Sequence, residues 1–402
     1  MKKILLLGGS EQQVIAIKTA QKLGYYTILC DYLEDNPGQN TADKFFLIST
    51  TDKEAVLKIA MDENIDGILA YASDPAAPTA AYVSEIMGLP GFPLQSVEIL
   101  CNKDLFRDFL SKNGFNVPRA MSYRSYEEVF QDIDNFEFPV LVKPVDSSGS
   151  KGISIQKNMY NLRSAFEFAN SFSRCGRVII EEFITQNHPY LIGGDILVVN
   201  GCVKLWGLLN CHRDQNVNKL VPVGKSYPLF LTDKDIFKVK ETLQSLVSKL
   251  NMTTGAMNVE LMIDDSGKVW PIDIGPRCGG NLIPDLLGYI WGIDIPEFLI
   301  KSAMGESTFF NIKESESCYA TYNLHSQQNG KLKNIWFSDY LQKYIIKKHL
   351  YSKKGDYIEY FDNAAKALGV IFMRFPTREV MFNLMDSIER EIHIELDSIE
   401  EV

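Results

Sequence analysis

The sequence has few cysteines, and none of them form a motif that would bind a metal or mark a redox centre. They occur singly, at Cys30, Cys101, Cys175, Cys202, Cys211, Cys278 and Cys318. Because their number is odd and no CxxC pair occurs, the sequence indicates neither a disulfide framework nor a zinc site. This usage fits a reducing cytosol, and we expect a cytoplasmic protein.

Long apolar runs and an excess of positive charge are also missing. No apolar stretch approaches the roughly 18 residues that cross a bilayer, and the N-terminal MKKILLLGG continues into a polar segment without a signal-peptide cleavage site. The chain has 41 basic and 51 acidic residues, a net charge of -10, which argues against a general binder of nucleic acids or anionic membranes. We therefore expect small-molecule partners, with no nucleic acid and no membrane.

The chain has ample material for a buried core, with 402 residues of which 46% are hydrophobic. Residues 1–100 alternate short apolar runs with helical patterns, which predicts a Rossmann-like βαβ domain with a parallel sheet. Residues 101–310 mix strands and helices, and the pair Asn200-Gly201 between two alternating apolar runs predicts a hairpin. A smaller α+β capping domain is expected over residues 311–402. The predicted fold class is therefore α/β followed by α+β.

Two familiar phosphate-binding loops are absent. The turn GGSEQQ after the first expected strand lacks the GxGxxG pattern, so a tight turn explains it better than a dinucleotide site. The stretch KPVDSSGSKGI, residues 143–153, lacks the GxxxxGK[ST] pattern of a Walker loop. Its small residues nevertheless allow consecutive backbone N–H groups to approach an anion, and Lys143 would add a charged donor. We predict a phosphate-binding loop; the alternative is a flexible hairpin.

The segment GAMNVELMIDDSGKVWPIDIGPR predicts a pair of facing carboxylates. A two-residue turn at Ser266-Gly267 would place Glu260 opposite Asp273, with Cβ atoms about 4.5 to 5.5 Å apart. Carboxylates this close repel each other unless a cation lies between them, and oxygen ligands with room for phosphate and water suit magnesium, with manganese as an alternative. A three-residue turn would put the two side chains on opposite faces. The other interpretation is an exposed acidic edge strand.

Two further groups are candidates. Arg277 follows Asp273 by four residues, and its guanidinium suits a phosphate or a carboxylate; the alternative is an ion pair with the nearby acids. In RVIIEEFI, one of Glu181 and Glu182 is expected to face the interior, where it could accept a hydrogen bond from an adenine amino group.

The order of these parts resembles the ATP-grasp superfamily. The motifs are Lys103 in NKDLFRDFLSKNGFNVP, Lys143 with its SSGSKG loop, EEFI, the NVELMI strand and IDIGPRCGG. The resemblance covers nearly the whole chain and includes the N-terminal domain and C-terminal cap of biotin carboxylase, glycinamide ribonucleotide synthetase and the amino acid ligases. It implies the ATP-grasp fold and an ADP-forming carboxylate–amine ligase that uses ATP and magnesium.

The resemblance also implies a role for each part. Lys103 and Lys143 would contact ATP phosphates, Glu260 and Asp273 would hold magnesium, and Arg277, with Lys143, would act in catalysis by stabilising the transferring phosphoryl group. The remaining implied ATP-binding residues form the lid over the phosphates, the hinge against adenine and a nearby histidine: Ser147, Ser148, Gly149, Ser150, Lys151, Gly152, Glu181, Glu182, Phe183, Ile184 and His188. The lid, residues 147–151, is expected to be poorly ordered without nucleotide.

Two positions depart from the family pattern. Gly275 stands where many relatives have an asparagine that binds metal, and the glutamate that contacts ribose has no counterpart, so His188 or Asp195 would take its place.

The implied reaction makes an acyl phosphate from ATP and a carboxylate, which an amine then attacks. The alternatives are bicarbonate activation, as in biotin carboxylase, and a non-catalytic ATP-binding regulatory module. Substrates are expected between Ser73 and Asp74 on one side and Arg277 and Asn281 on the other. The sequence does not name them, and it leaves a homodimer open.

Overall fold

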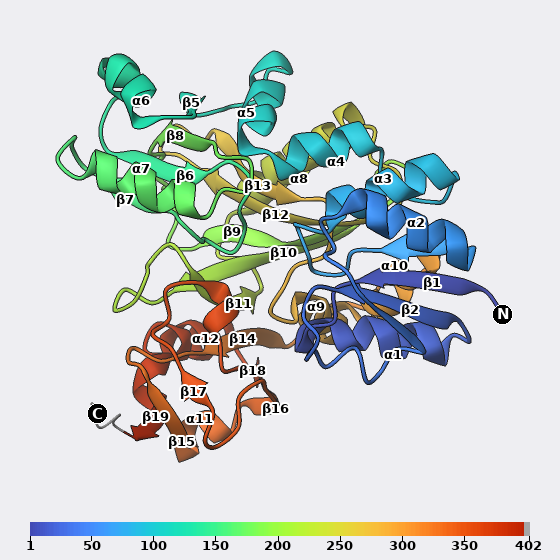
Figure 1. The fold of residues 1–402 in the computed structure, drawn as a ribbon. Coiled ribbons are helices and arrows are strands. Elements are labelled where there is room, and N and C mark those ends of the chain that lie inside the picture. The colour runs from blue at the N-terminus through green and yellow to red at the C-terminus, as the bar shows by residue number, and fades with distance from the viewer. Residues whose placement is uncertain (398–402) are drawn as a thin grey trace.

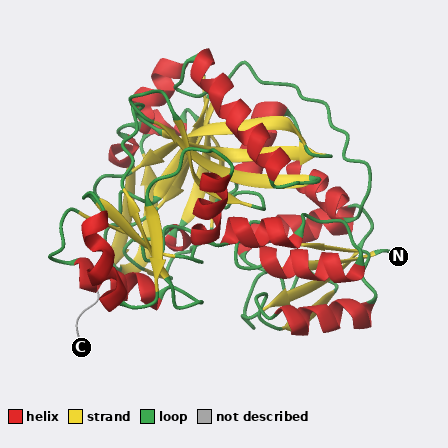
Figure 2. Cartoon of the chain, turned by 90° about the horizontal axis from the view of Figure 1, so that it is seen from above, coloured by secondary structure: helices red, strands yellow, loops and turns green. Residues whose placement is uncertain are grey.

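The structure is a computed structural model that describes residues 1–397, which form four β-sheets flanked by helices (Figure 1). The N-terminal part lies to one side of the molecule, and the C-terminal part lies beneath the large central sheet in this view. Seen from above, strands of the central sheet run between layers of helices (Figure 2). The mixed α/β class predicted from the sequence is confirmed.

A parallel sheet in the order β3-β2-β1-β4 begins the chain. Alternate residues of β1 pack in two different cores, Ile4 and Leu6 in one and Leu5 and Leu7 in the other, because the sheet is covered on both faces. The strands are β1 (Lys3–Leu7), β2 (Tyr26–Asp31), β3 (Lys44–Leu47) and β4 (Gly67–Leu69), and the helices are α1 (Val14–Lys22), α2 (Lys53–Glu63) and α3 (Ala77–Met87).

A small antiparallel sheet follows, in the order β5-β8-β6-β7. Its strands are β5 (Ala120–Tyr123), β6 (Val140–Pro144), β7 (Ser154–Gln156) and β8 (Val178–Glu182); its helices are α6 (Tyr126–Asp132) and α7 (Leu162–Ser171), and α4 (Leu94–Cys101) and α5 (Lys103–Lys112) lead into it. One face, with Val142 and Ile180, packs against α6 and α7. Because side chains alternate along a strand, the other face carries Lys143 and Glu181.

The large sheet has the order β13-β12-β9-β10-β11-β14-β18-β16, with all neighbours antiparallel. Its strands are β9 (Leu191–Val199), β10 (Cys202–Arg213), β11 (Pro222–Tyr227), β12 (Gly255–Ile263), β13 (Val269–Gly275), β14 (Cys318–Leu324), β16 (Ile345–Leu350) and β18 (Gly369–Phe375). Helix α8 (Asp233–Lys249) packs on one face. Helices α9 (Ile283–Trp291) and α10 (Ile295–Ala303) cover part of the other.

A third antiparallel sheet completes the C-terminal part, with β15 (Gly330–Phe337) between β17 (Tyr357–Ile358) and β19 (Ile392–Asp397). Two helices accompany it, α11 (Asp339–Gln342) and α12 (Arg378–Met385). Because β14, β16 and β18 also belong to the large sheet, this sheet continues across residue 310. The boundaries at residues 100 and 310 remain a proposal.

The predicted hairpin at Asn200-Gly201 is confirmed. Val199 pairs directly with Cys202, so the turn has two residues, and both have positive φ, 49° and 77°. A two-residue turn of this kind needs φ above zero at both positions, which Asn and Gly supply at little cost.

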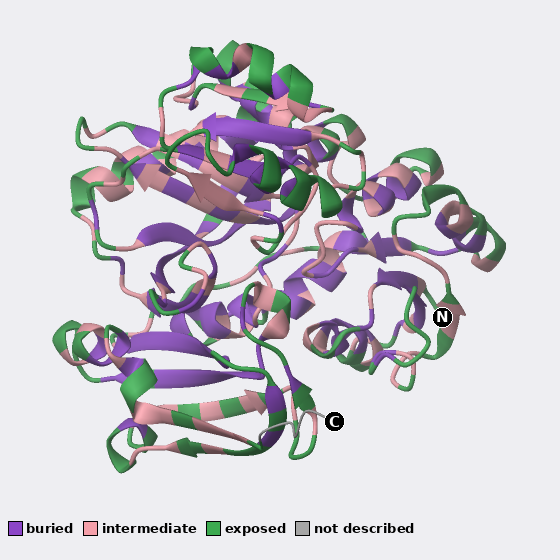
Figure 3. Ribbon diagram, turned by 60° about the vertical axis from the view of Figure 1, so that its left-hand side comes forward, coloured by how far each residue is buried: buried purple, intermediate pink, exposed green. Residues whose placement is uncertain are grey.

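The strands of the large sheet are mostly buried, whereas the outward sides of the helices are exposed (Figure 3). All seven cysteines are free. Within residues 1–397, no helix combines the length and the apolar character needed to cross a bilayer.

Close packing between β9 and β10 depends on Gly194. Its φ is +117°, and a Cβ atom there would lie 2.0 Å from the carbonyl oxygen of Gly207. Both the backbone conformation and the space therefore exclude a side chain. Gly194 also lies between Gly193 and Asp195, which belong to the candidate site described below.

We expect Gly194→Ala to lower the free energy of unfolding by about 2 to 4 kcal/mol, because it adds a clash with backbone to an unfavourable φ. The control is Gly201→Ala in the hairpin turn, where the nearest atom is 3.6 Å away and only the backbone cost of about 1 kcal/mol applies. Chemical denaturation compares the two variants. Equal stability of both would contradict this view of Gly194.

Candidate active site

Glu260 on β12 faces Asp273 on β13, as the sequence predicted. The two-residue turn on which that prediction rested is wrong. Gly267 N–H donates to the carbonyl of Asp264 (2.9 Å) and Asp264 N–H to that of Lys268 (3.1 Å), which encloses a three-residue loop. A bulge then leaves Ile272 without a partner and restores the register, since Leu261 pairs with Pro271 but Glu260 pairs with Asp273. The bulge thus offsets the extra loop residue.

Neither carboxylate has a protein partner. Glu260 and Asp273 are both partly buried, and within residues 1–397 neither accepts a hydrogen bond or forms an ion pair. The described part of the chain also holds no cluster of three or more His, Cys, Asp or Glu that could bind a metal. An ion between these two carboxylates would therefore complete its shell with phosphate oxygens and water, which is how magnesium is commonly bound. The donor set fits this ion.

Lys103 and Lys143 are both buried, and they lie beside a group of charges that spans the small and large sheets. Lys143 Nζ lies 2.8 Å from a carboxylate oxygen of Glu181, and Arg107 Nε lies 3.1 Å from the other. Arg107 also donates to the carbonyl of Ile272, next to Asp273 (2.8 Å). Lys103 Nζ donates to the carbonyl of Ser147 (2.6 Å). Through Arg107, the charges around Lys143 on the small sheet therefore reach the strand of the large sheet that carries Asp273.

Burial and the nearest opposite charge shift the pKa values of Lys143 and Glu181 in opposite directions. Burial, together with Arg107 and Lys103, lowers the pKa of Lys143 to about 8, although Glu181 favours its charged form. Burial would raise the pKa of Glu181, but Arg107 and Lys143 outweigh it and hold that pKa at about 2. Glu181 is therefore ionised and bound by two cations. The inward-facing carboxylate of Glu181 is therefore bound by protein side chains.

Arg277 pairs with Asp74, which comes from the N-terminal part of the chain, rather than with the nearby acids Glu260 and Asp273. Burial alone would lower the pKa of Arg277, but the charge of Asp74 raises it above its ordinary value. Arg277 also donates to the carbonyl of Cys278 (3.0 Å). The ion pair joins the N-terminal sheet to the end of β13.

Charged groups of the N-terminal part and of the candidate site both act on the thiol of Cys101, at the end of α4. Burial raises the pKa of its thiol, and the charges of Asp74, Arg277, Asp273 and Lys103 all act on it. These four charges come from three segments of the chain, and the Cys101 thiol itself lies 3.9 Å from the carbonyl of Asp74.

The backbone after Arg277 is held by two polar contacts. Asp195 is fully buried and accepts from Gly279 N–H (2.9 and 2.8 Å) and from Asn258 Nδ2 (2.8 Å). Asn281 N–H donates to Gln12 in the N-terminal turn (2.9 Å). Burial raises the pKa of Asp195 to about 6 despite these hydrogen bonds. Asp195 thus anchors the loop that carries Arg277, and its contact with ribose stays a prediction.

The lid reaches across the site. Gly149, Ser150 and Gly152 all have left-handed backbone, with φ of 66°, 60° and 73°. Ser150 Oγ donates to the carbonyl of Leu220 (3.1 Å), and the Ser147 carbonyl accepts from Lys103. Ser148 lies between these two contacts, and Lys151 follows the second. The expectation that nucleotide binding orders this loop stays a prediction.

The expected hinge residues occupy the end of β8 and the chain beyond it. Glu182 points away from Glu181 and accepts from the N–H of Glu137 (3.2 Å), so only one of the two glutamates faces inward. Phe183 and Ile184 follow at the edge of the sheet. His188 is buried, with Nδ1 2.5 Å from the Tyr190 carbonyl and Nε2 accepting from Ile263 N–H (3.0 Å). Both ring nitrogens are thus engaged by backbone groups.

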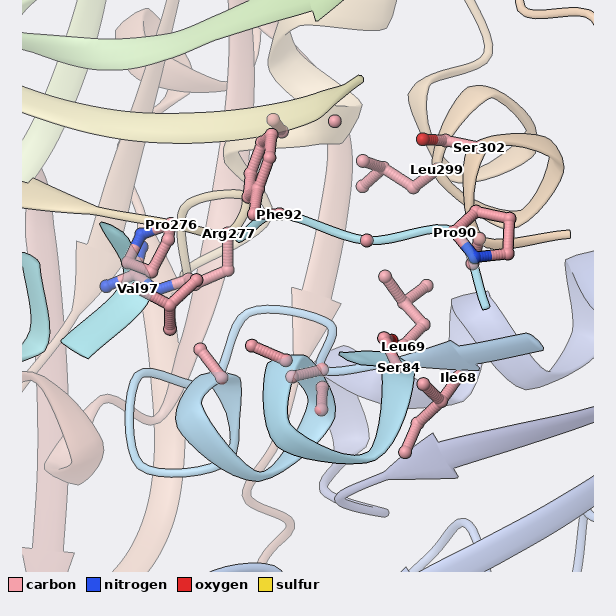
Figure 4. A pocket seen from close by; sticks show the side chains of 18 of the residues that line it. Ile68, Leu69, Ser84, Pro90, Phe92, Val97, Pro276, Arg277, Leu299 and Ser302 are labelled. Carbon is pink, nitrogen blue, oxygen red and sulfur yellow. The ribbon is translucent and has the colours of Figure 1, made fainter. Parts of the chain in front are cut away.

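A mostly apolar cavity lies behind Arg277, between α3, the start of β12 and α10 (Figure 4). Arg277 and Pro276 lie at one end, Pro90 and Ser302 at the other, and Phe92 covers its upper side. Small residues such as Ala80 in α3 leave the space open.

The sequence did not identify Arg107 as a site residue. It lies one helical turn after Lys103 on α5, so this spacing was the signal that could have indicated it. The pairing of Arg277 with Asp74 had no local signal, because 203 positions separate the two residues.

A small sheet with buried lysines, a large sheet with two facing carboxylates and a preceding Rossmann-like sheet together define the ATP-grasp class of nucleotide-binding folds. Residues 108–279 match the family model described as the ATP-grasp domain. The chain therefore contains an ATP-grasp domain, as the sequence predicted.

Comparison with known proteins agrees with this. The formate-dependent phosphoribosylglycinamide formyltransferase of Bacteroides thetaiotaomicron is 27% identical over 281 residues, 69% of this chain and 71% of that protein. The L-amino acid ligase of Bacillus licheniformis superposes with a TM-score of 0.84 over 99% of both chains, at 19% identity. The biotin carboxylase domain of the Hydrogenobacter thermophilus 2-oxoglutarate carboxylase gives a TM-score of 0.74 at 19% identity, covering 98% of this chain and 91% of that one.

We expect Glu260→Gln to leave the fold intact and to abolish stabilisation by magnesium. Within residues 1–397 Glu260 makes no hydrogen bond or ion pair; its repulsion from Asp273 and its attraction to Lys225 oppose each other, so the free energy of unfolding should change by no more than a few tenths of a kcal/mol. Thermal unfolding with ATP, with and without magnesium, measures both effects. Glu98→Gln, on the exposed side of α4, is the control. A magnesium-dependent shift in E260Q equal to that of the unchanged protein would contradict the metal assignment.

Affinity for magnesium-ATP should depend on the protonation of Lys143. The pKa of Lys143 is about 8 without ligand, and nearby phosphates would raise it. Above about pH 8, Lys143 therefore takes up a proton when magnesium-ATP binds. The affinity is then constant below about pH 8 and falls above it, by up to tenfold per pH unit. Lys143→Arg, which stays charged, should flatten the profile. Titration calorimetry from about pH 7.5 to about pH 9.5 tests this, and an affinity that is flat in the unchanged protein would contradict it.

Proposed function

We propose that this protein is an ADP-forming, ATP-dependent carboxylate–amine ligase. The observation that carries the proposal is the pair Glu260 and Asp273, which face each other without protein partners, next to Arg277 and the buried lysines. A divalent cation would bind between these carboxylates, and the lysines would hold phosphates. The site thus has the charges that phosphoryl transfer requires, in one place.

Each part of the proposed site has one task. Lys103 and Lys143 hold the phosphates of ATP, and the lid from Ser147 to Gly152 closes over them, so that water is excluded. The chain from Glu181 to Ile184, with His188 nearby, forms the adenine side. Arg277 neutralises charge on the transferring phosphoryl group once Asp74 releases it. Glu260 and Asp273 would hold magnesium, which would neutralise part of the phosphate charge.

The proposed chemistry has two steps. A carboxylate oxygen of the acid forms a bond to the γ-phosphorus while the bond from that phosphorus to the β–γ bridging oxygen breaks, and ADP leaves. The nitrogen of the amine then attacks the acyl carbon, the bond from carbon to the phosphate oxygen breaks, and inorganic phosphate leaves as the nitrogen loses a proton. In both steps the protein mainly positions groups and neutralises charge.

The names of the related proteins support acid activation without specifying the acid. They refer to formate, to L-amino acids, and to bicarbonate bound with MgADP. The chain carries all its cysteines as free thiols, which supports a cytoplasmic location. The proposed substrates are small molecules, an acid and an amine, which would bind near the place where the N-terminal part meets the loop of Arg277.

The proposal is tested by measuring ADP and phosphate release with ATP, magnesium and a panel of acids and amines that includes formate, bicarbonate and the amino acids. Turnover should require an acid and an amine, and Glu260→Gln should reduce it by at least about 100-fold. With an ¹⁸O-labelled acid, the label should appear in the released phosphate, because the carboxylate oxygen stays bonded to phosphorus.

Other outcomes would contradict the proposal. Turnover with bicarbonate alone would indicate a carboxylase, and tight magnesium-ATP binding without turnover for any acid would indicate a regulatory module.

A further inference from the structure

Lys225 lies on the same sheet face as Glu260 but is not among the residues predicted from the sequence. It is on β11, directly beside Cys211 on β10, and Gly193 on β9 lies directly beside Glu260 on β12. A Cβ atom on Gly193 would lie 3.0 Å from Lys225 Nζ and 2.5 Å from Cys211 Sγ. The ammonium group of Lys225 therefore extends over Gly193, on the strand next to Glu260.

The ammonium group of Lys225 has too few partners for its burial. The residue is only 9% exposed, and in the described part of the chain its only hydrogen bond goes to Cys211 Sγ (2.7 Å). An ammonium group has three donors, and a thiol is a weak acceptor. The described residues place no hydrogen-bonded anion on this buried cation, and a ligand anion would complete its donors.

Lys225 nevertheless remains charged. Burial acts against the charged form, but the carboxylate of Glu260 favours it at neutral pH, and the pKa of Lys225 lies above its ordinary value. The thiol is itself neutral at neutral pH, because burial raises the pKa of Cys211. The charge of Lys225 is thus available to an incoming anion.

Arg213 provides a second cation on the same side. It lies on β10 two residues after Cys211, so both side chains leave the same face of the sheet. One donor goes to the carbonyl of Lys219 (3.3 Å), while its buried Nε has no partner in the described residues. Lys225, over Gly193, and Arg213, two residues after Cys211, thus leave several N–H donors without a partner in the described residues.

On this face of the large sheet, the paired carboxylates and the two cations therefore lie on different strands. The carboxylates Glu260 and Asp273 lie on β12 and β13, the cations Lys225 and Arg213 lie on β11 and β10, and Gly193 on β9 separates the two groups. A metal ion suits the first group and an oxyanion suits the second. The two ligands would lie side by side on the sheet, opposite the lysines of the small sheet.

We propose that Lys225, supported by Arg213, forms an oxyanion site that binds the carboxylate of the acid substrate and then the phosphoryl group transferred to it. This inference rests on the proposed ligase function and adds the residue that holds the acid. Lys225 would place a carboxylate oxygen next to the γ-phosphate and offset the repulsion between the two anions. Lys103 and Lys143, on the other sheet, would remain with the nucleotide.

The test uses inorganic phosphate as the probe, so that no substrate needs to be known. Titration calorimetry measures phosphate binding to the full-length protein saturated with MgADP. Lys225→Gln should weaken phosphate binding by at least about tenfold, the equivalent of one charge-assisted hydrogen bond, and Lys225→Arg should stay within about threefold of the unchanged protein. MgADP affinity, measured separately, should not change. Lys204→Gln, which removes an exposed lysine at the start of β10, is the control.

A second variant keeps the test independent of how well K225Q folds. Gly193→Ala crowds Lys225 Nζ without removing its charge and should weaken phosphate binding severalfold. Phosphate affinities unchanged in both K225Q and G193A would overturn the inference and leave the ligase proposal standing. Failure of the unchanged protein to bind MgADP would instead contradict the proposed function.

Discussion

The candidate site depends on one constraint: Glu260 and Asp273 face each other across β12 and β13 with no protein group to separate their charges. Two ionised carboxylates at this spacing repel each other, and the fold tolerates them because hydrophobic packing beneath holds the strands. Val259, Leu261 and Ile274, on the opposite face, pack in the core under α8. The sheet therefore stabilises an arrangement that favours a cation.

The other charges of the site are partly neutralised within the protein. Glu181 is bound by Arg107 and Lys143, and Asp74 is bound by Arg277. These ion pairs lower the free-energy cost of burying Arg107, Lys143 and Arg277 and fix their orientation. Each cation retains donors that an anion can use. Since Asp74 belongs to the N-terminal part, release of Arg277 toward a ligand would also change the contact between that part and the ATP-grasp domain. Under the proposed mechanism, ligand binding would therefore be coupled to the placement of the N-terminal sheet through this ion pair.

Much of this arrangement was predictable from the sequence, and the rest depended on contacts over long distances. The parallel N-terminal sheet followed from the alternation of apolar runs, and the Asn200-Gly201 hairpin from the conformations that those two residues prefer. The facing of Glu260 and Asp273 was predicted through a turn that is wrong, and a bulge at Ile272 compensates for it. Bulges have no clear local pattern, so this success was partly fortuitous. Arg107, the Asp74–Arg277 pair and the position of Lys225 arise from packing between distant segments, which spacing alone does not reveal.

The central claim is that Glu260 and Asp273 bind one divalent cation next to the phosphates of ATP. The most direct measurement is a crystal structure with ADP and manganese, in which anomalous scattering locates the ion. The account predicts an anomalous peak between the two carboxylates, in contact with phosphate oxygens. Well-ordered ADP with no peak between Glu260 and Asp273, or with manganese bound elsewhere, would contradict it.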